Sequence, residues 1–173
     1  MPFQSTVSLQ QGFGVPGELF SDSPFRCQPF ILNTTSHPEY NIVGATCCTV
    51  TSQGIATAGG TGIFAGFLVD PKVYALQGTV AGGTLAPSLT LPNYTNVELL
   101  TEGEIIVTLP GAAAIGDVVI FNQTTGAISS QTPSTAVPSG SSYAFAVVSR
   151  FTVSGAGLAV IMVTPQQNPY VAQ

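Results

Sequence analysis

Short hydrophobic runs, separated by Gly, Pro and small polar residues, recur along the whole chain. Residues 42–51 show the clearest alternation, because every second side chain from Val43 to Thr49 falls on one face of an extended strand. No long stretch places apolar residues at the spacing of a helical face, so no helix is predicted. The predicted strands are residues 27–32, 42–51, 63–69, 73–76, 97–100, 104–109, 118–122, 127–129, 143–153 and 158–164.

Turn-forming clusters divide these runs. Gly59 to Gly62, Pro110-Gly111 and residues 123–126 each stand between two predicted strands, and residues 130–142 are rich in Ser, Thr, Pro and Gly. Many short strands with frequent turns predict an all-β fold, either a jelly-roll-like sandwich or a partly open barrel.

The first 25 residues have a different character. They combine several Gly and Pro residues with scattered apolar side chains, too few to close a core and too many to prefer water. We therefore predict an extended N-terminal arm over residues 1–25 and a single β domain over residues 26–173, with a loop-rich insertion around 77–96. The candidate protein-interface residues are Phe3, Phe13, Val15, Phe20 and Phe25. The alternative is that these side chains close the core of their own domain.

Charge is unusually sparse. The 173 residues include 3 basic and 8 acidic side chains, for a net charge of −5, and only 6% of residues are charged, against about 25% in an ordinary domain. A free monomer normally carries a denser charged surface, which indicates that other subunits cover much of this one. Three basic side chains are too few to form a surface that follows a phosphate backbone. Direct nucleic-acid binding is therefore not expected. A hydrophobic fraction of 45% argues against disorder.

No membrane partner is expected either, since the longest apolar stretch, residues 156–163, is far shorter than the ~18 residues that a spanning helix needs. The first residues have neither a basic segment nor an apolar one, so no signal peptide is expected. Cys27, Cys47 and Cys48 match no metal or redox spacing, and we expect free, mostly buried thiols in a reducing cytosol.

Few residues are candidates for catalysis or metal binding. His37, the only histidine, is predicted to be an exposed loop residue, and with Glu39 it would supply only half of a metal site. Glu102 and Glu104 would share a face if both lay on one strand, as a glycosidase pair requires, but the preferred reading is a solvated acidic turn before residues 104–109. The glycine-rich stretches lack the phosphate-loop pattern. No enzyme, metal or cofactor is predicted.

Several blocks resemble the structural cement proteins that decorate the capsids of tailed bacteriophages. Residues 63–76 (IFAGFLVDPKVYAL) resemble that family's segment of FAG, two hydrophobic residues and V-(N/D)-P-K-x-Y-A-L. Further similar blocks, in the same order, are residues 14–18, 23–26, 91–95, 98–105, 115–119 with 125–126, and 157–161.

The resemblance implies a non-enzymatic virion protein on the outside of an HK97-like icosahedral head, made in the cytoplasm of a bacterial host. It implies a jelly-roll-like β domain that works as a homodimer or homotrimer and clamps neighbouring copies of the major capsid protein. The alternatives are another virion part, such as a head fibre base, tail tube or adhesin, and a carbohydrate-binding β domain.

Overall fold

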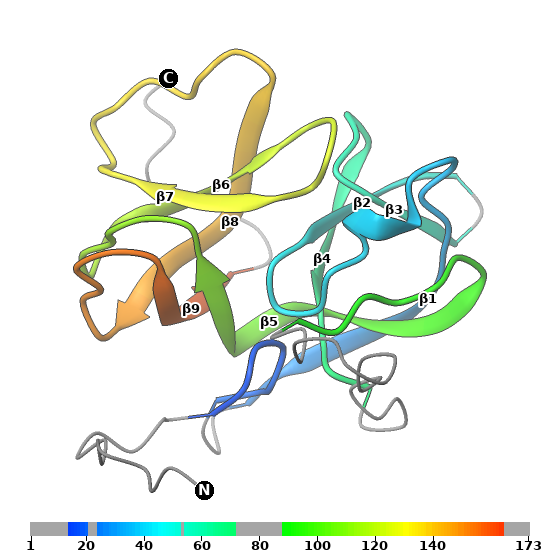
Figure 1. Cartoon of the computed structure of the whole chain (residues 1–173), viewed down its shortest axis with the longest axis horizontal. Coiled ribbons are helices and arrows are strands. Elements are labelled where there is room, and N and C mark those ends of the chain that lie inside the picture. Colours follow the sequence, from blue (N-terminus) through cyan, green and yellow to red (C-terminus); the bar gives the residue numbers. More distant parts are fainter. Residues whose placement is uncertain (1–13, 21–23, 53, 72–87, 165–173) are drawn as a thin grey trace, which may run out of the picture.

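The computed structural model describes residues 14–20, 24–52, 54–71 and 88–164, and this part of the chain is built from strands (Figure 1). The only helical element in the described ranges is the single 3-10 turn Pro38–Tyr40. The strands are β1 (Arg26–Leu32), β2 (Cys47–Ser52), β3 (Ile55–Ala58), β4 (Ile63–Leu68), β5 (Thr95–Leu109), β6 (Val118–Asn122), β7 (Ile128–Gln131), β8 (Ser141–Arg150) and β9 (Gly157–Val163).

Five strands close into a barrel in the order β1-β3-β2-β4-β5, because β5 also pairs with β1. All these pairs are antiparallel except β1–β3. The all-β prediction is confirmed, and of the two architectures left open it is the barrel that forms, as a closed ring with extra strands.

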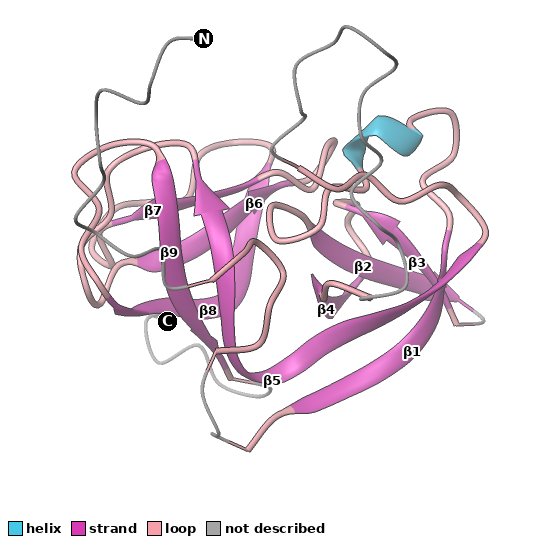
Figure 2. Ribbon diagram, turned by 60° about the horizontal axis from the view of Figure 1, so that its bottom comes forward, coloured by secondary structure: helices cyan, strands magenta, loops and turns pink. Residues whose placement is uncertain are grey.

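The extra strands form a second sheet that grows from the same long strand. The C-terminal half of β5 pairs with β9, and the order continues through β8 and β6 to β7. Figure 2 shows β5 running from the barrel into this second sheet. Because β5 belongs to both layers, it fixes the barrel and the sheet against each other.

The core lies in two places. Between barrel and sheet, Phe67 and Leu100 pack with Ile105 and Ile161 of the sheet, whereas the interior of the barrel holds a second cluster around Leu32. Cys47 belongs to the first cluster and Cys48 to the second, since successive side chains of a strand point to opposite faces. All three cysteines are free, with Cys47 and Cys48 fully buried, as predicted.

The strand boundaries differ from the prediction at several points, among them β8, which spans Ser141–Arg150 where residues 143–153 were predicted. Residues 97–100 and 104–109 belong to the single strand β5, because Gly103 adopts φ +121° and lets the chain bend without leaving the sheet. Of residues 42–51 only the part from Cys47 is a regular strand, because the preceding residues form turns. Strand β3 was not predicted.

Other expectations fall partly or wholly outside the described residues. The predicted strand at 73–76 lies outside them, as does most of the predicted insertion around 77–96, of which residues 88–94 are irregular and bridge to Ile42 through Thr90. The division into an arm and a domain stays a prediction. No helix in the described ranges is long and apolar enough to span a bilayer.

Candidate functional site

Residues 14–20 lie along the edge of β5 that β9 leaves open, drawn as the blue segment beneath β5 in Figure 1. The amide of Gly17 donates to the carbonyl of Ile106 at 2.8 Å, and the Ile106 amide donates to the carbonyl of Glu18 at 2.9 Å. The Phe20 amide donates to the carbonyl of Glu104, also at 2.9 Å. This part of the predicted arm therefore docks on its own domain by strand addition.

Two glycines allow this close approach. Gly17 has φ +85°, and a Cβ there would lie 2.2 Å from Cγ1 of Val43. Gly44 has φ +67°, and a Cβ there would lie 2.3 Å from the Gly17 amide nitrogen. Any larger residue would push residues 14–20 away from the barrel.

A charged pair anchors the end of this segment. The Glu104 side chain is 2% exposed and accepts hydrogen bonds from Nε of Arg150, 3.1 Å from each carboxylate oxygen. The guanidinium also lies over the ring of Phe20, 5.3 Å from its centroid. Phe20 in turn meets Phe151 edge to face at 6.1 Å. Arg150 thus joins the second sheet, β5 and the arm segment.

Glu102 and Glu104, the alternative glycosidase pair, lie in different environments. Glu102 is exposed, while Glu104 is buried against Arg150, so the prediction of a solvated acidic turn is wrong for Glu104. Between them Gly103 has φ +121°, so the regular alternation that would have given the two side chains a common face is interrupted. The structure therefore offers no two-carboxylate arrangement at this place for glycoside hydrolysis.

Exposed apolar side chains gather around this anchored segment. Val15 and Phe25 are 49% and 57% exposed, and Met162, the cross-strand neighbour of Glu104, is 40% exposed. Phe25 lies against Gly103. We call the exposed side chains of Val15, Phe25, Phe151 and Met162, together with the half-buried Phe20, the arm-base surface. Of the predicted interface residues, Val15, Phe20 and Phe25 are in this surface, and Phe3 and Phe13 lie outside the described residues.

Sequence reasoning missed Arg150, Phe151 and Met162. Arg150 ends β8, Phe151 follows it, and Met162 lies in β9, while Arg150 is separated from Glu104 by 46 positions. Nothing in the sequence connects these positions, because the contact arises only when β8, β9 and β5 pair.

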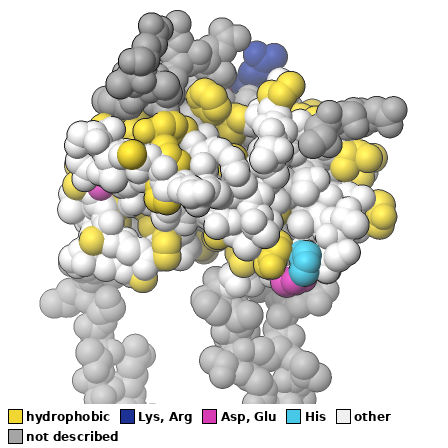
Figure 3. All heavy atoms as spheres, turned by 90° about the horizontal axis from the view of Figure 1, so that it is seen from above, with side chains coloured by type: hydrophobic (Ala, Val, Ile, Leu, Met, Phe, Trp, Pro, Cys, Tyr) yellow, Lys and Arg dark blue, Asp and Glu magenta, His cyan; other side chains and the backbone are white. Residues whose placement is uncertain are grey.

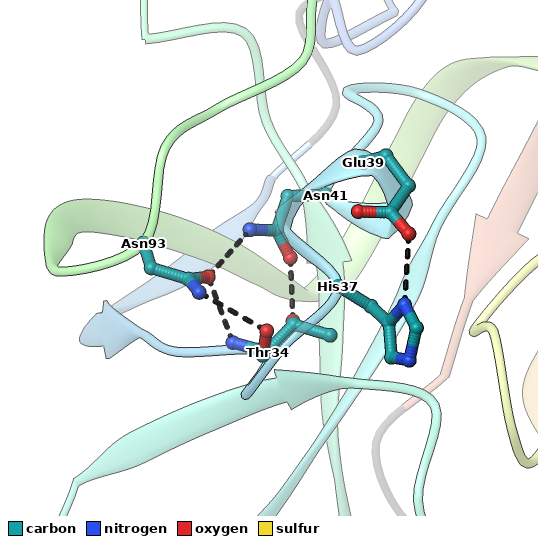
Figure 4. Close-up of polar contacts among 5 residues, drawn as sticks. All are labelled: Thr34, His37, Glu39, Asn41 and Asn93. Carbon is teal, nitrogen blue, oxygen red and sulfur yellow. Dashed lines mark hydrogen bonds and ion pairs between the residues drawn. The ribbon is translucent and has the colours of Figure 1, made fainter.

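His37 and Glu39 form an exposed hydrogen-bonded pair (Figure 4). Nδ1 of His37 lies 2.8 Å from Oε1 of Glu39, and the imidazole stacks on Tyr40 at 4.9 Å. Hydrogen bonding to His37 lowers the pKa of the Glu39 carboxyl. No group of three or more metal-ligating side chains occurs among the residues that the structure describes.

The neighbouring polar network in Figure 4 is structural. The Asn41 amide donates to Oδ1 of Asn93 and to the carbonyl of Leu91, while Thr34 donates its hydroxyl to Asn41. Asn93 completes the ring with bonds to the backbone of Thr34. These side chains satisfy one another, so they hold the loops together and leave no unpaired group for a ligand.

The surface in Figure 3 is mostly hydrophobic and uncharged polar, with few charged side chains on this face. This agrees with a chain in which 6% of residues are charged. A surface of this composition suits contact with protein better than exposure to water.

The family model described as "Structural cement protein (E217 gp24/Pam3 gp6)" matches residues 3–164. The chain belongs to the phage structural cement protein family. This confirms the resemblance found in the sequence blocks. For this cement protein, membership indicates a structural, capsid-associated role in a bacteriophage virion.

A chain from a structure described as "The capsid of Myoviridae Phage XM1" has a similar fold. The two superpose with a TM-score of 0.56 at 16% identity, over 94% of this cement protein and 97% of that chain. At this identity the comparison shows the shared fold. No curated protein matches the sequence.

Proposed function

We propose that the protein decorates the outside of an HK97-like head and clamps neighbouring copies of the major capsid protein. It acts there without catalysis, as a homodimer or homotrimer made in the bacterial cytoplasm. Family membership supports the structural role. The observation that carries the finer proposal is the arm-base surface, where exposed apolar side chains surround a segment that the sheet holds in place.

The proposed mechanism is mass action. A ligand that binds only the assembled shell stabilises it by RT ln(1 + [L]/Kd), about 2.7 kcal/mol per site when the free concentration is 100 times Kd. Repeated over many sites, this would resist internal DNA pressure and heat. The net charge of −5 favours the exterior, away from packaged DNA.

In the arm-base surface, Val15 and Phe25 are the proposed capsid contacts among the described residues. The few residues that dominate an interface, often aromatic ones, each cost about 2 kcal/mol or more of binding free energy when truncated. Arg150 is already paired with Glu104, so burying this surface would not leave an unpaired cation.

The test is co-sedimentation of the purified protein with decoration-stripped heads of its own phage. We expect saturable binding at a fixed ratio to the major capsid protein, with a raised head-disruption temperature. Phe25→Ser and Val15→Ser should each weaken binding at least tenfold. The matched control is Ile115→Ser, because Ile115 is 61% exposed but lies in the connection between β5 and β6.

Deletion of residues 1–13 distinguishes the contribution of these residues to head binding from that of the arm-base surface. It leaves the hydrogen bonds of residues 14–20 to β5 in place. Loss of head binding with unchanged thermal unfolding would support a contact made by Phe3 or Phe13. An unchanged affinity would contradict that part of the proposal. Absence of binding to expanded heads by the intact protein would refute the cement role, and ring polymers in electron micrographs would favour a tail tube.

A further inference from the structure

A cleft of about 330 Å³ opens between the barrel and the second sheet, where the β3–β4 connection meets β6 and β8. Its lining includes Phe64 of the barrel, Tyr143 and Phe145 of β8, and Gln123 and Ser142 beside them. None of these residues belongs to the arm-base surface. The volume is at the small end of the ~300–1,000 Å³ of ligand pockets.

The aromatic side chains are held in place by their neighbours. The rings of Phe64 and Phe145 lie 5.2 Å apart, and Phe64 also meets Phe67 edge to face at 5.9 Å. Phe64, Tyr143 and Phe145 are only half-buried, so parts of their rings remain accessible from the cleft.

The backbone of β8 is distorted at this point. Val118 pairs with Val147 and Ile120 with Tyr143, so three residues of β8 stand opposite one residue of β6. Within this bulge Phe145 has φ +47°, a conformation that costs a non-glycine residue about 1–3 kcal/mol. Bulges of this kind re-aim side chains and are frequent beside functional sites.

The cleft is also preformed. The amide of Gly60 donates to the carbonyl of Gln123 at 2.6 Å, which ties the barrel connection to the β6–β7 hairpin. Nε2 of Gln123 donates to the hydroxyl of Ser142 at 2.7 Å and so fixes the amide plane. Binding would therefore require little ordering of the protein.

The polar groups of the lining are neutral. The described residues of the lining include no Asp, Glu, Lys, Arg or His. No hydrogen bond within the described part of the chain uses the Tyr143 hydroxyl or Oε1 of Gln123. The cleft thus combines apolar ring faces with the hydroxyls of Thr61, Ser142 and Tyr143 and the acceptor carbonyl of Gln123.

We propose that this cleft binds a neutral sugar unit of a glycan. A pyranose ring has an apolar C–H face that packs on aromatic rings and equatorial hydroxyls that pair with amide and phenol groups. The absence of charge in the described lining disfavours nucleotides and acidic sugars, because their phosphate or carboxylate would meet no cation. Without a carboxylate pair in that lining the site binds rather than hydrolyses. The proposal goes beyond the cement role and does not depend on it.

The test uses the full chain against immobilised neutral oligosaccharides of glucose, galactose and mannose, with uronic-acid oligosaccharides as the charged comparison. Each oligosaccharide that binds is then titrated into the protein in solution while the NMR chemical shifts of the backbone amides are recorded. We expect selective binding of a neutral oligosaccharide, with the largest shifts at residues 60–64, 121–123 and 142–145.

Variants locate the site. Tyr143→Ala should weaken sugar binding at least tenfold. Tyr143→Phe removes only the hydroxyl, so it should weaken sugar binding several-fold while preserving the fold. The control is Tyr94→Asn, because Tyr94 is 77% exposed outside the cleft and has φ +64°, which Asn tolerates.

Failure to bind any neutral sugar, preference for the charged oligosaccharides, or unchanged affinity in both Tyr143 variants would overturn the proposal. So would loss of head binding in Tyr143→Phe with no effect on sugar, because the cleft would then be a capsid contact. These outcomes are read separately from co-sedimentation of the intact protein, which tests the cement role.

Discussion

Replacing Arg150 with Met should destabilise the protein more than the half-exposed position of Arg150 suggests. The substitution keeps an unbranched apolar stem but removes the guanidinium that pairs with the Glu104 carboxylate, whose side chain is 2% exposed. The carboxylate would then be buried without its cation. Breaking a buried ion pair from one side costs about 3–5 kcal/mol.

The magnitude for this pair lies near the lower end of that range. Because the Arg150 side chain is 48% exposed, water can enter when it is removed and solvate part of the Glu104 charge. Loss of the cation–π contact with Phe20 adds about 0.5–1 kcal/mol. We therefore expect a loss of about 3–4 kcal/mol, and a fall in Tm of about 10 °C at some 2–4 °C per kcal/mol for a chain of this length.

Urea unfolding at neutral pH measures the loss, and hydrogen exchange shows where it acts. Exchange should quicken at the amides of Ile106 and Phe20, because these amides hold residues 14–20 on β5. The double variant Glu104→Leu/Arg150→Met should recover most of the loss, since no unpaired charge remains. A loss below about 1 kcal/mol in the single variant, or an equal loss in the double variant, would refute this account of the pair.

Three further outcomes follow from the packing. Gly17→Ala should cost about 2–4 kcal/mol in urea unfolding, because its Cβ would strike the barrel, whereas Gly54→Ala, at φ +73° with nothing within 4 Å, should cost about 1–2 kcal/mol. Burial raises the pKa of the Cys48 thiol to about 12 and that of Cys47 well above its ordinary value, so a thiol reagent at pH 8 should modify at most Cys27 until the protein unfolds. The same burial keeps both thiols protonated in the folded state, whereas thiols of the unfolded chain ionise near pH 8.5. The free energy of unfolding should therefore be full below that pH. Above it, toward pH 12, each of the two thiols should lower the free energy of unfolding by up to about 1.4 kcal/mol per pH unit. Urea unfolding between pH 7 and 10.5 checks this. Cys48→Ala should make the free energy of unfolding fall less steeply with pH, because the contribution of one thiol is removed.

The strands were predictable where hydrophobic runs are bounded by turn residues. Residues 118–122 of the prediction coincide with β6, and residues 158–164 match β9 to within one position. The prediction divided β5 because an acidic turn was expected before residues 104–109, yet pairing with β1 up to Glu102 and with β9 from Gly103 keeps the strand continuous. Local pattern shows where strands occur, and long-range pairing decides where they end.

The candidate sites were less predictable than the fold. The apolar character of residues 14–20 indicated docking, but the receiving edge of β5 lies more than 80 positions along the chain. The charged anchor and the aromatic cleft each join residues from separate strands, and the cleft also depends on the bulge in β8. A sequence shows neither register nor bulges, so these arrangements became visible only in three dimensions.

The arm-base surface and the aromatic cleft should act independently, because they share no residue and differ in chemistry. Phe25→Ser should weaken head binding and leave sugar binding unchanged, while Tyr143→Phe should do the reverse. Measuring both activities on both variants, with unfolding free energies alongside, separates loss of a contact from loss of the fold. A variant that weakened both activities at unchanged stability would contradict this independence and indicate that the shell and the sugar compete for one surface. The expected pattern would leave the cleft open on the decorated head, where a virion could use it to hold glycans without loosening its shell.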